Sequence, residues 1–304
     1  MEYHKPALLN ESVDGLSIVA NGCYVDVTFG GGGHAKEMLR RLSEEGRLFA
    51  FDQDPDAENN RLDDERFSLI PQNFSFLKNF LRMYNVIPVD GVLADLGVSF
   101  HQFDVPKRGF SFRFEGPLDM RMDQKRKLTA AKVVNSYSAD QLEVIFKEYG
   151  ELRNAKQIVD RIEIARKKKK ITTVEGFKAI LKDITPEKMQ HKFLAQVFQA
   201  LRIEVNEELK VIQDLLEQTV EVLKVGGRMS VITYHSLEDR LVKNFFKTGN
   251  VQGKVEKDFF GNLIRPMEPI NRKPIVPGAA EIKDNNRSRS AKLRIAEKVK
   301  GHEQ

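Results

Sequence analysis

The apolar positions of the chain follow two different periods. Short apolar runs recur between stretches in which apolar residues stand three and four positions apart, the spacing of a helix with one buried face. Because strands that alternate with helices build parallel sheets covered on both faces, this pattern predicts an α/β fold with a parallel, doubly wound sheet. The predicted strands are Tyr24–Val27, Leu48–Phe51, Arg66–Ile70, Val89–Asp95 and Arg228–Tyr234.

Helical spacing precedes and separates these strands. Val13 and Leu16 predict a short opening helix, with Asn10 as its N-cap. The longest amphipathic stretch, Val197–Leu223, predicts one continuous helix. Gly226 and Gly227 follow it directly and would end it as a C-cap.

The region between residues 105 and 200 departs from this alternation. It begins with glycine, aromatic and basic residues and then shows helical spacing only. Ser138, followed three residues later by Gln141, is a typical start signal for one of these helices. We therefore predict a sheet domain formed by residues 1–104 and 201–304, with an inserted helical domain at 105–200.

Four consecutive glycines, Gly30–Gly33, join the first strand to a helix-like run, and the next strand ends on Asp52. Glycines let backbone N–H groups approach a ligand closely, and the helix N-terminus adds further donors. A carboxylate about twenty residues further on is placed to accept hydrogen bonds from ribose hydroxyls. The arrangement favours a site for the adenosine half of a cofactor over a merely flexible loop. Its spacing fits NAD, and Asp26-x-Thr28-x-Gly30-x-Gly32 equally fits S-adenosylmethionine (SAM), so the loop alone does not choose.

Other polar and aromatic residues follow predicted strands, at the edge where ligands of such sheets bind. Phe74 follows the third strand, Asp95 ends the fourth, and His235 follows the fifth. His235 is open to two interpretations, substrate contact or simple packing. Ser236 and Asp239 have the N-cap and N3 spacing of a capping box, which explains both without a functional role.

Composition restricts the class of protein. The chain of 304 residues is long enough for a large core, and its formal charge of +5 leans mildly toward a polyanionic partner. The single cysteine, Cys23, excludes an internal disulfide and a multi-cysteine metal site. No His/Asp/Glu cluster has ligand spacing, so we expect no metal. No apolar run approaches membrane-spanning length and the N-terminus lacks a signal-peptide pattern, so we expect a cytoplasmic protein that does not contact membrane.

Basic residues gather in two places. The run Arg166–Lys170 is either a solvated helix end or a contact for RNA phosphates. In the tail, Arg287 and Arg289 are predicted to contact phosphates. The alternative is that these arginines, with Lys292 and Arg294, form the polar side of an edge strand.

Specific motifs occur in a fixed order along the chain. They are Thr28–His34, Asp95–Ser99, Arg108–Phe112, Pro117–Met122, Phe198–Ile203 with Val205-Asn206 and Glu208-Leu209, His235–Arg240 and Arg287–Ala291. In this order they closely resemble the bacterial ribosomal RNA small subunit methyltransferase H family, over nearly the whole chain. Enzymes of that family use SAM to methylate N4 of a decoding-centre cytidine in 16S rRNA (position 1402 in the usual rRNA numbering). The resemblance implies a Rossmann-like SAM-dependent methyltransferase sheet, SAM as cofactor, 16S rRNA in the small ribosomal subunit as partner, and substrate recognition by the inserted domain.

The resemblance also implies roles for individual residues. Where the family commonly has Ser-Ser-Pro-Gln, this chain has Ser99-Phe100-His101-Gln102, so the shape of that loop does not carry over. The implied cofactor residues are Gly32, Gly33 and His34 at the methionine portion of SAM, Asp52 at the ribose, Phe74 at the adenine, and Asp95 with Gln102 at the rest of the pocket.

Methylation of a cytosine amine needs an acceptor for an N4 hydrogen, because the nitrogen lone pair is delocalised into the ring. Asp95 or a neighbouring backbone carbonyl is the candidate acceptor, and the alternative is that Asp95 only binds SAM. Two rival functions remain at this point, an NAD-dependent oxidoreductase and a non-catalytic RNA-binding or assembly factor. The candidate substrate contacts are Phe110 or Phe112, stacked on an unstacked base, together with Arg108, His235, Arg287 and Arg289.

Overall fold

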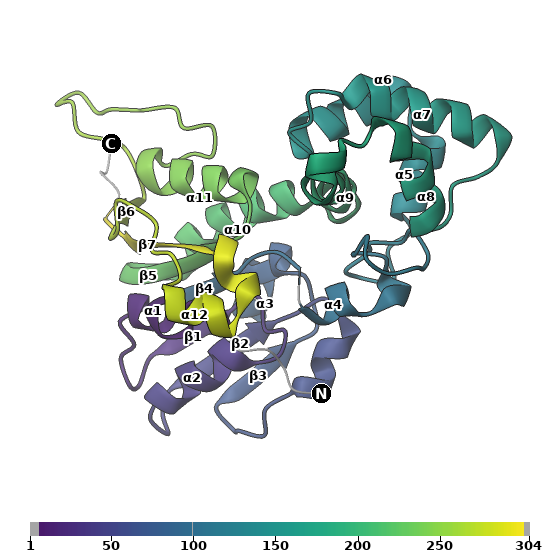
Figure 1. Ribbon diagram of the computed structural model, residues 1–304. Coiled ribbons are helices and arrows are strands. Elements are labelled where there is room, and N and C mark those ends of the chain that lie inside the picture. The colour runs from purple at the N-terminus through teal and green to yellow at the C-terminus, as the bar shows by residue number, and fades with distance from the viewer. Residues whose placement is uncertain (1–5, 99, 301–304) are drawn as a thin grey trace. The chain divides into compact units, whose positions relative to one another are not determined.

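The computed structural model describes residues 6–98 and 100–300, and these form two compact units (Figure 1). One unit contains the chain up to Gly97 and again from Leu209 onward, and the other spans Val98–Glu208. The predicted insertion, 105–200, lies inside the second unit. Ser99, the last residue of one motif, falls outside the described residues.

The first unit is built on a seven-stranded sheet in the order β3-β2-β1-β4-β5-β7-β6. The first five strands in this order pair in parallel, whereas β7 is antiparallel to both β5 and β6. The predicted α/β fold with a doubly wound sheet is therefore confirmed. The strands are β1 (Cys23–Asp26), β2 (Arg47–Phe51), β3 (Phe67–Ile70), β4 (Val89–Asp95), β5 (Leu223–Thr233), β6 (Met267–Pro269) and β7 (Lys292–Lys298).

Successive strand residues face opposite sides of this sheet, and each side has its own apolar core. Val25 and Val92 pack in one core, while their chain neighbours Tyr24 and Leu93 pack in the other. Two cores of this kind explain why the strands read as continuous apolar runs. The helices of this unit are α1 (Leu9–Gly15), α2 (Gly33–Arg41), α3 (Leu77–Met83), α10 (Glu208–Val222), α11 (Ser236–Thr248) and α12 (Ala279–Asp284), with 3-10 turns η1 (Pro55–Asn60), η2 (Phe74–Phe76) and η7 (Asn286–Ser290).

The second unit is helical, with an apolar core that includes the fully buried rings of Phe146 and Phe177. The predicted start at Ser138 is confirmed, because Ser138 and Gln141 form a reciprocal capping box. Its elements are α4 (Phe100–Asp104), η3 (Pro106–Arg108), α5 (Ala130–Ser136), α6 (Ala139–Val144), η4 (Ile145–Tyr149), α7 (Ala155–Lys168), α8 (Val174–Leu181), η5 (Lys182–Ile184), η6 (Glu187–Met189) and α9 (Gln190–Asn206).

The prediction of one continuous helix over Val197–Leu223 is wrong. The chain forms α9 and α10 instead, with Glu207 between them in the left-handed region at φ 53°. The predicted C-cap at Gly226 and Gly227 is also wrong, because both glycines lie within β5. The pairing of β4 with β5 shifts register between Val89 and Gly91, which indicates an irregularity such as a β-bulge. Gly226, with φ +81°, provides the backbone conformation that this irregular part of β5 requires.

Two further predictions at chain ends need correction. Asn10 lies inside α1 rather than at its N-cap, which is Leu8. The alternative in which the basic tail forms an edge strand is wrong, because β7 lies between β5 and β6. Among the described residues, none of the helices is long and apolar enough to cross a membrane.

Candidate functional site

The glycine loop lies between the end of β1 and the start of α2. Gly32 is the N-cap of α2 and has φ +74°, a conformation that glycine adopts without strain. The loop is held to the tip of β2, since Gly30 N–H donates to the Asp52 carboxylate at 2.8 Å. The other Asp52 oxygen accepts the N–H of Asp54 at 2.8 Å. Asp52, predicted as the ribose residue, is thus fixed against the loop.

A second carboxylate, Asp26, is fully buried at the end of β1. Its Oδ1 accepts the N–H of Thr28 at 3.0 Å, while its Oδ2 has no hydrogen-bond partner. Burial, with a contribution from Asp52, raises the pKa of Asp26 to about 7. Our list of site residues from the sequence omitted Asp26, although its place at the head of the loop motif was visible.

Asp95, at the end of β4, is the centre of a small polar cluster. The Tyr234 hydroxyl donates to Asp95 Oδ1 at 2.8 Å, and His34 Nδ1 lies 3.8 Å from Asp95 Oδ2. The Asp95 N–H donates to the Thr28 hydroxyl at 2.6 Å, which ties this cluster to the one at Asp26. Burial raises the pKa of Asp95 to about 7, partly offset by the Tyr234 hydrogen bond. Tyr234 was missed because nothing in its apolar strand marks it as a donor to Asp95.

His34 is neutral in this environment, because burial lowers its pKa to about 4. Its Nε2 lies 3.3 Å from the Ala7 carbonyl, which places the proton on Nε2 and leaves the Nδ1 lone pair toward Asp95. The segment Pro6–Leu8 that supplies this carbonyl is itself fixed. Pro6 packs on Gly33 so closely that a Cβ there would lie 2.2 Å from the proline ring, and Leu8 N–H donates to Glu281 at 2.9 Å.

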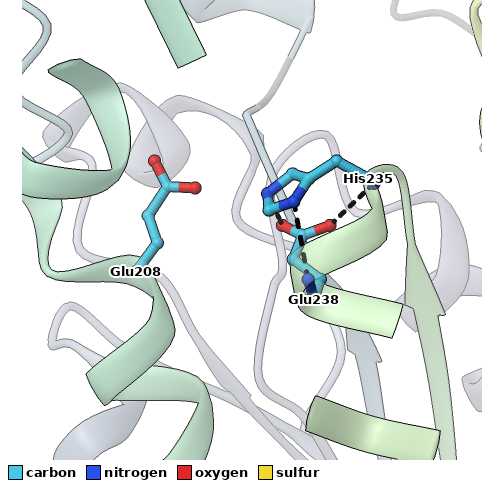
Figure 2. A group of neighbouring side chains, drawn as sticks. All are labelled: Glu208, His235 and Glu238. Carbon is cyan, nitrogen blue, oxygen red and sulfur yellow. Dashed lines mark hydrogen bonds and ion pairs between the residues drawn. The ribbon is translucent and has the colours of Figure 1, made fainter. Parts of the chain in front are cut away.

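The residues that follow β5 form a buried histidine–carboxylate pair (Figure 2). Glu238, fully buried, accepts the N–H of Tyr234 at 2.8 Å and lies 3.1 Å from His235 Nε2. His235 Nδ1 in turn faces the Glu238 N–H at 3.5 Å. The capping box of α11 is therefore formed by His235 and Glu238, and the predicted pair of Ser236 and Asp239 is wrong by one residue. This geometry accounts for His235 by helix capping, and its substrate contact stays a prediction.

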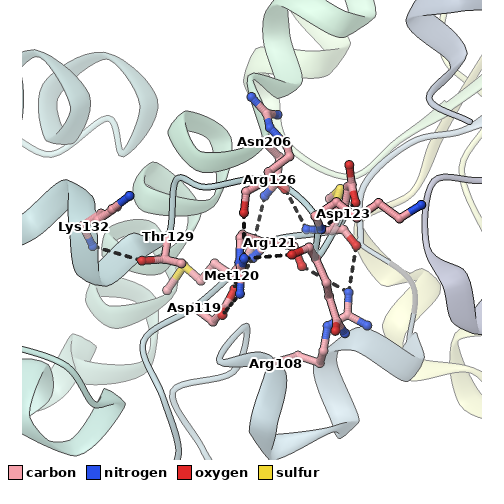
Figure 3. A network of polar contacts seen from close by, with 12 residues as sticks. Arg108, Asp119, Met120, Arg121, Asp123, Arg126, Thr129, Lys132 and Asn206 are labelled. Atoms are coloured by element: carbon pink, nitrogen blue, oxygen red, sulfur yellow. Dashed lines mark hydrogen bonds and ion pairs between the residues drawn. The ribbon is translucent and has the colours of Figure 1, made fainter.

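In the second unit, the motif between Pro117 and Met122 is held by side-chain hydrogen bonds to main-chain groups (Figure 3). Asn206 accepts the Met122 N–H at 2.8 Å and donates to the Met120 carbonyl at 2.8 Å. The Arg108 guanidinium donates to the Met122 carbonyl at 2.9 Å and is only 5% exposed. Arg108, predicted as a substrate contact, is thus engaged inside this unit.

The other predicted residues differ in their accessibility. Phe110 is only 3% exposed, so Phe112, partly buried against Phe198, is the candidate stacking ring with more accessible surface. Phe74 is half-buried in η2, and Gln102 is buried within the second unit.

The basic residues of the tail and of the run Arg166–Lys170 also differ in whether they are exposed or engaged within their own unit. Arg287 and Arg289 are exposed in η7, as a phosphate contact requires. Arg294 instead pairs with Asp239 inside the unit, at 2.7 Å. Arg166 donates to two carbonyls of the second unit, whereas the lysines after it are exposed at the end of α7.

Together, the first unit presents backbone donors at the glycine loop beside two carboxylates, the buried Asp26 and the partly buried Asp95. A buried carboxylate without a full set of partners is costly, so this arrangement favours a cationic ligand. An open depression beside the loop, lined by Gly31, Lys36 and residues 59–63, contains neither carboxylate. We place the candidate site at the carboxylates, because the charge that selects a ligand lies there.

Comparison with known proteins gives a consistent picture. The chain is 58% identical to ribosomal RNA small subunit methyltransferase H of Flavobacterium johnsoniae, over 98% of this chain and 99% of that protein. It is 55% identical to the protein of the same name from Bacteroides thetaiotaomicron, over 98% of both. A putative methyltransferase from Streptococcus mutans, solved in complex with SAH, is 13% identical with a TM-score of 0.44, covering 97% of this chain and 99% of that one, a likeness too low to carry weight. The profile of the MraW methylase family matches residues 1–299, and the chain therefore belongs to that family.

Proposed function

We propose that this methylase transfers the methyl group of SAM to N4 of a cytidine in the decoding centre of 16S rRNA. Its relatives carry the name ribosomal RNA small subunit methyltransferase H at 52–58% identity, and family membership excludes the oxidoreductase alternative. The sequence motifs that the chain shares with this family support the decoding-centre cytidine as the target nucleotide. The observation that carries the proposal is the pair of carboxylates at the glycine loop, Asp26 buried and Asp95 partly buried.

The residues at the loop fit SAM. This ligand carries positive charge on its sulfonium and on its amino group, and Asp26 Oδ2 is a buried acceptor without a partner. Asp95 adds a second carboxylate, and the unprotonated Nδ1 of His34 adds a neutral acceptor. When bound, SAM supplies an electrophilic methyl group. NAD would instead bring a pyrophosphate, whose negative charge these two acids disfavour.

The chain's own groups then have distinct roles. The Gly33 N–H and the His34 ring would hold the methionine portion. Gly32, whose own N–H donates to the Phe29 carbonyl at 2.7 Å, would let the backbone approach it closely, and Asp52 would hold the ribose. Phe74, from η2, would pack on the adenine. Positioning accounts for much of the rate in this kind of transfer, because the nucleophile must lie in line with the bond that breaks.

Asp95 has two possible roles, and both use the same carboxylate. It would either accept an N4 hydrogen as the amine attacks, or stabilise the donor alone. Replacement by asparagine separates these roles when turnover is measured at saturating SAM. A loss of turnover supports the acceptor role, whereas full turnover with weakened SAM binding removes it.

The proposed function is tested with small ribosomal subunits isolated without this methylation. Incubation with labelled SAM should incorporate label into 16S rRNA, and mass spectrometry of the digested RNA should place it on N4 of the decoding-centre cytidine. Label on another nucleotide would refute the proposed site. No label, with subunit binding retained, would instead support a non-catalytic RNA-binding or assembly factor.

A further inference from the structure

A β-hairpin between α11 and β6 is not used by the proposed chemistry (Figure 1). Its two arms bridge at Lys257 and Leu263, and they are joined by hydrogen bonds from Ile264 N–H to the Glu256 carbonyl and from Asp258 N–H to the Asn262 carbonyl, each 2.9 Å long. It belongs to the first unit.

The tip of this hairpin presents two phenylalanine rings to solvent. Phe259 is 98% exposed and Phe260 is 84% exposed. The rings contact each other edge to face, with centroids 5.7 Å apart and an interplanar angle of 87°. Aromatic side chains of a monomer are seldom so fully exposed as an adjacent pair, so this tip indicates a binding function.

The sequence specifies the shape of the tip. The Asp258 carboxylate accepts the N–H groups of Phe260 at 2.9 Å and of Asn262 at 2.8 Å. Gly261 adopts φ +86°, which suits glycine in a tight turn. The turn is thus held by its own side chains, and the two rings occupy defined positions at its apex.

The base of the hairpin is anchored to the C-terminal end of α11. The Asn250 side chain accepts the Lys254 N–H at 2.9 Å and donates to the Lys254 carbonyl at 2.7 Å. The Asn244 side chain donates to the Val251 carbonyl at 3.0 Å. Because the backbone of the hairpin is held in place, binding has to order only the two side chains, which favours a direct contact with a partner.

The size and charge of the tip favour RNA as that partner. Two phenylalanine side chains offer about 300–500 Å², below the roughly 600–1,000 Å² that each partner buries in a stable protein–protein interface. One or two stacked bases match the smaller area. Lys254 and Lys257 are exposed on the first arm, and Glu256 between them offsets part of their charge. Asp258 is committed to the turn.

We propose that Phe259 and Phe260 form a stacking site for unpaired bases of the RNA substrate, with Lys254 and Lys257 supplying charge toward neighbouring phosphates. The identity of the RNA rests on the proposed function. The stacking site itself adds a substrate contact on the sheet unit, apart from the glycine loop and from the helical unit. Base–aromatic stacking tolerates any base, so this contact contributes affinity more than sequence selection.

The test compares two double variants that keep the tip apolar but differ in their π surface. Phe259→Leu with Phe260→Leu removes the aromatic faces, and Phe259→Trp with Phe260→Trp enlarges them. With unmethylated small subunits as substrate, the leucine variant should raise KM for subunits about tenfold for each stacked base lost. Its turnover at saturating subunits and its Kd for SAM should stay within about twofold of wild type, as expected for binding affinity alone. The tryptophan variant should match or improve on the wild-type KM.

An unchanged KM in the leucine variant would overturn the proposal. Two other results would also overturn it, each with an unchanged KM for subunits in the variant Phe259→Ala with Phe260→Ala. If that variant abolishes binding to vesicles of phosphatidylcholine with phosphatidylserine, the rings contact a membrane. If it abolishes a concentration-dependent dimer, they contact a second copy of the chain. Measuring the binding of wild type and of the leucine variant to unmethylated subunits, in the absence of SAM, tests the stacking site separately from the proposed function. If wild type binds but does not methylate, the proposed function fails, while weaker binding of the leucine variant still supports the stacking site.

Discussion

Replacing Tyr234 with phenylalanine removes the hydroxyl that donates to Asp95 at 2.8 Å and keeps the ring. Loss of this donor should raise the pKa of Asp95, which is already about 7. A hydrogen bond to a charged group is worth about 1.5–3 kcal/mol, and one pKa unit corresponds to about 1.36 kcal/mol. We therefore expect the pKa to rise by about 1–2 units.

The effect of this pKa shift on activity depends on which protonation state of Asp95 binds SAM. In the proposed site, ionised Asp95 is the form that would attract the cationic SAM, so kcat/KM for SAM should fall as the pH decreases through the pKa of the free enzyme. A rise of one unit lowers the ionised fraction at pH 7 from about one half to about one tenth. At pH 7 the variant should thus lose about fivefold in kcat/KM for a rise of one unit and about fiftyfold for two, and by about pH 10 it should approach wild type.

The assay is a pH profile of kcat/KM for SAM with both proteins. The charged and titratable groups near Asp95 are Asp26, His34, Glu238 and Tyr234 itself. Asp26 also has a pKa of about 7, so the fall of kcat/KM at low pH, the acid limb of the profile, reports the titration of Asp26 and Asp95 together. Only the shift of this limb between wild type and Tyr234→Phe is assigned to the Tyr234 hydroxyl. Tyr84→Phe, at an exposed ring on the flank of α3, is the matched control and should leave the limb in place. An acid limb at the same pH in wild type and Tyr234→Phe would refute the reasoning.

Three other substitutions test the site and the fold. Asp26→Asn should make the free energy of unfolding less dependent on pH. The pKa of Asp26 in the folded protein, about 7, exceeds the usual 3.8, so wild type without ligand loses stability as the pH rises from about 4 to 7, by at most about 4 kcal/mol. Urea unfolding of both proteins at pH 5 and pH 8 measures this difference. The same variant should bind SAM more weakly by calorimetry. Gly33→Ala would place a Cβ 2.2 Å from Pro6, so it should displace that segment and weaken SAM binding at least tenfold, while Gly278→Ala, in open space, should not. Asn206→Leu leaves two buried main-chain groups unpaired and should cost about 1–3 kcal/mol by urea unfolding; a smaller loss would mean that the loop re-pairs elsewhere.

The sheet was predictable because its evidence is local. Each parallel strand is an apolar run buried on both faces, and the glycines and Asp52 follow such runs directly. Parallel topology then brings the strand ends to one edge. That edge carries Asp26, Asp52 and Asp95, and family membership agrees with the cofactor that they favour.

Features that depend on tertiary contacts were not predictable in the same way. The break between α9 and α10 has no glycine or proline to mark it; Glu207 takes a left-handed conformation beside Asn206, whose side chain is used by a loop more than eighty residues earlier in the chain. His235 is an uncommon N-cap, so a conventional serine was chosen one position away. The bond from Tyr234 to Asp95 joins groups 139 positions apart, which no local pattern reports.

Two segments far apart in the sequence meet beside the proposed SAM site. Ala7 and Leu8 pack against Leu293 and Ile295 of β7, while the Ala7 carbonyl faces His34. A polypeptide interrupted before Lys292 has no β7, so Ala7 and Leu8 lose their contacts with Leu293 and Ile295, while the contact of Pro6 with Gly33 and the Leu8 bond to Glu281 remain. Cleavage near Lys292 should therefore loosen His34, although the two residues are far apart in the sequence.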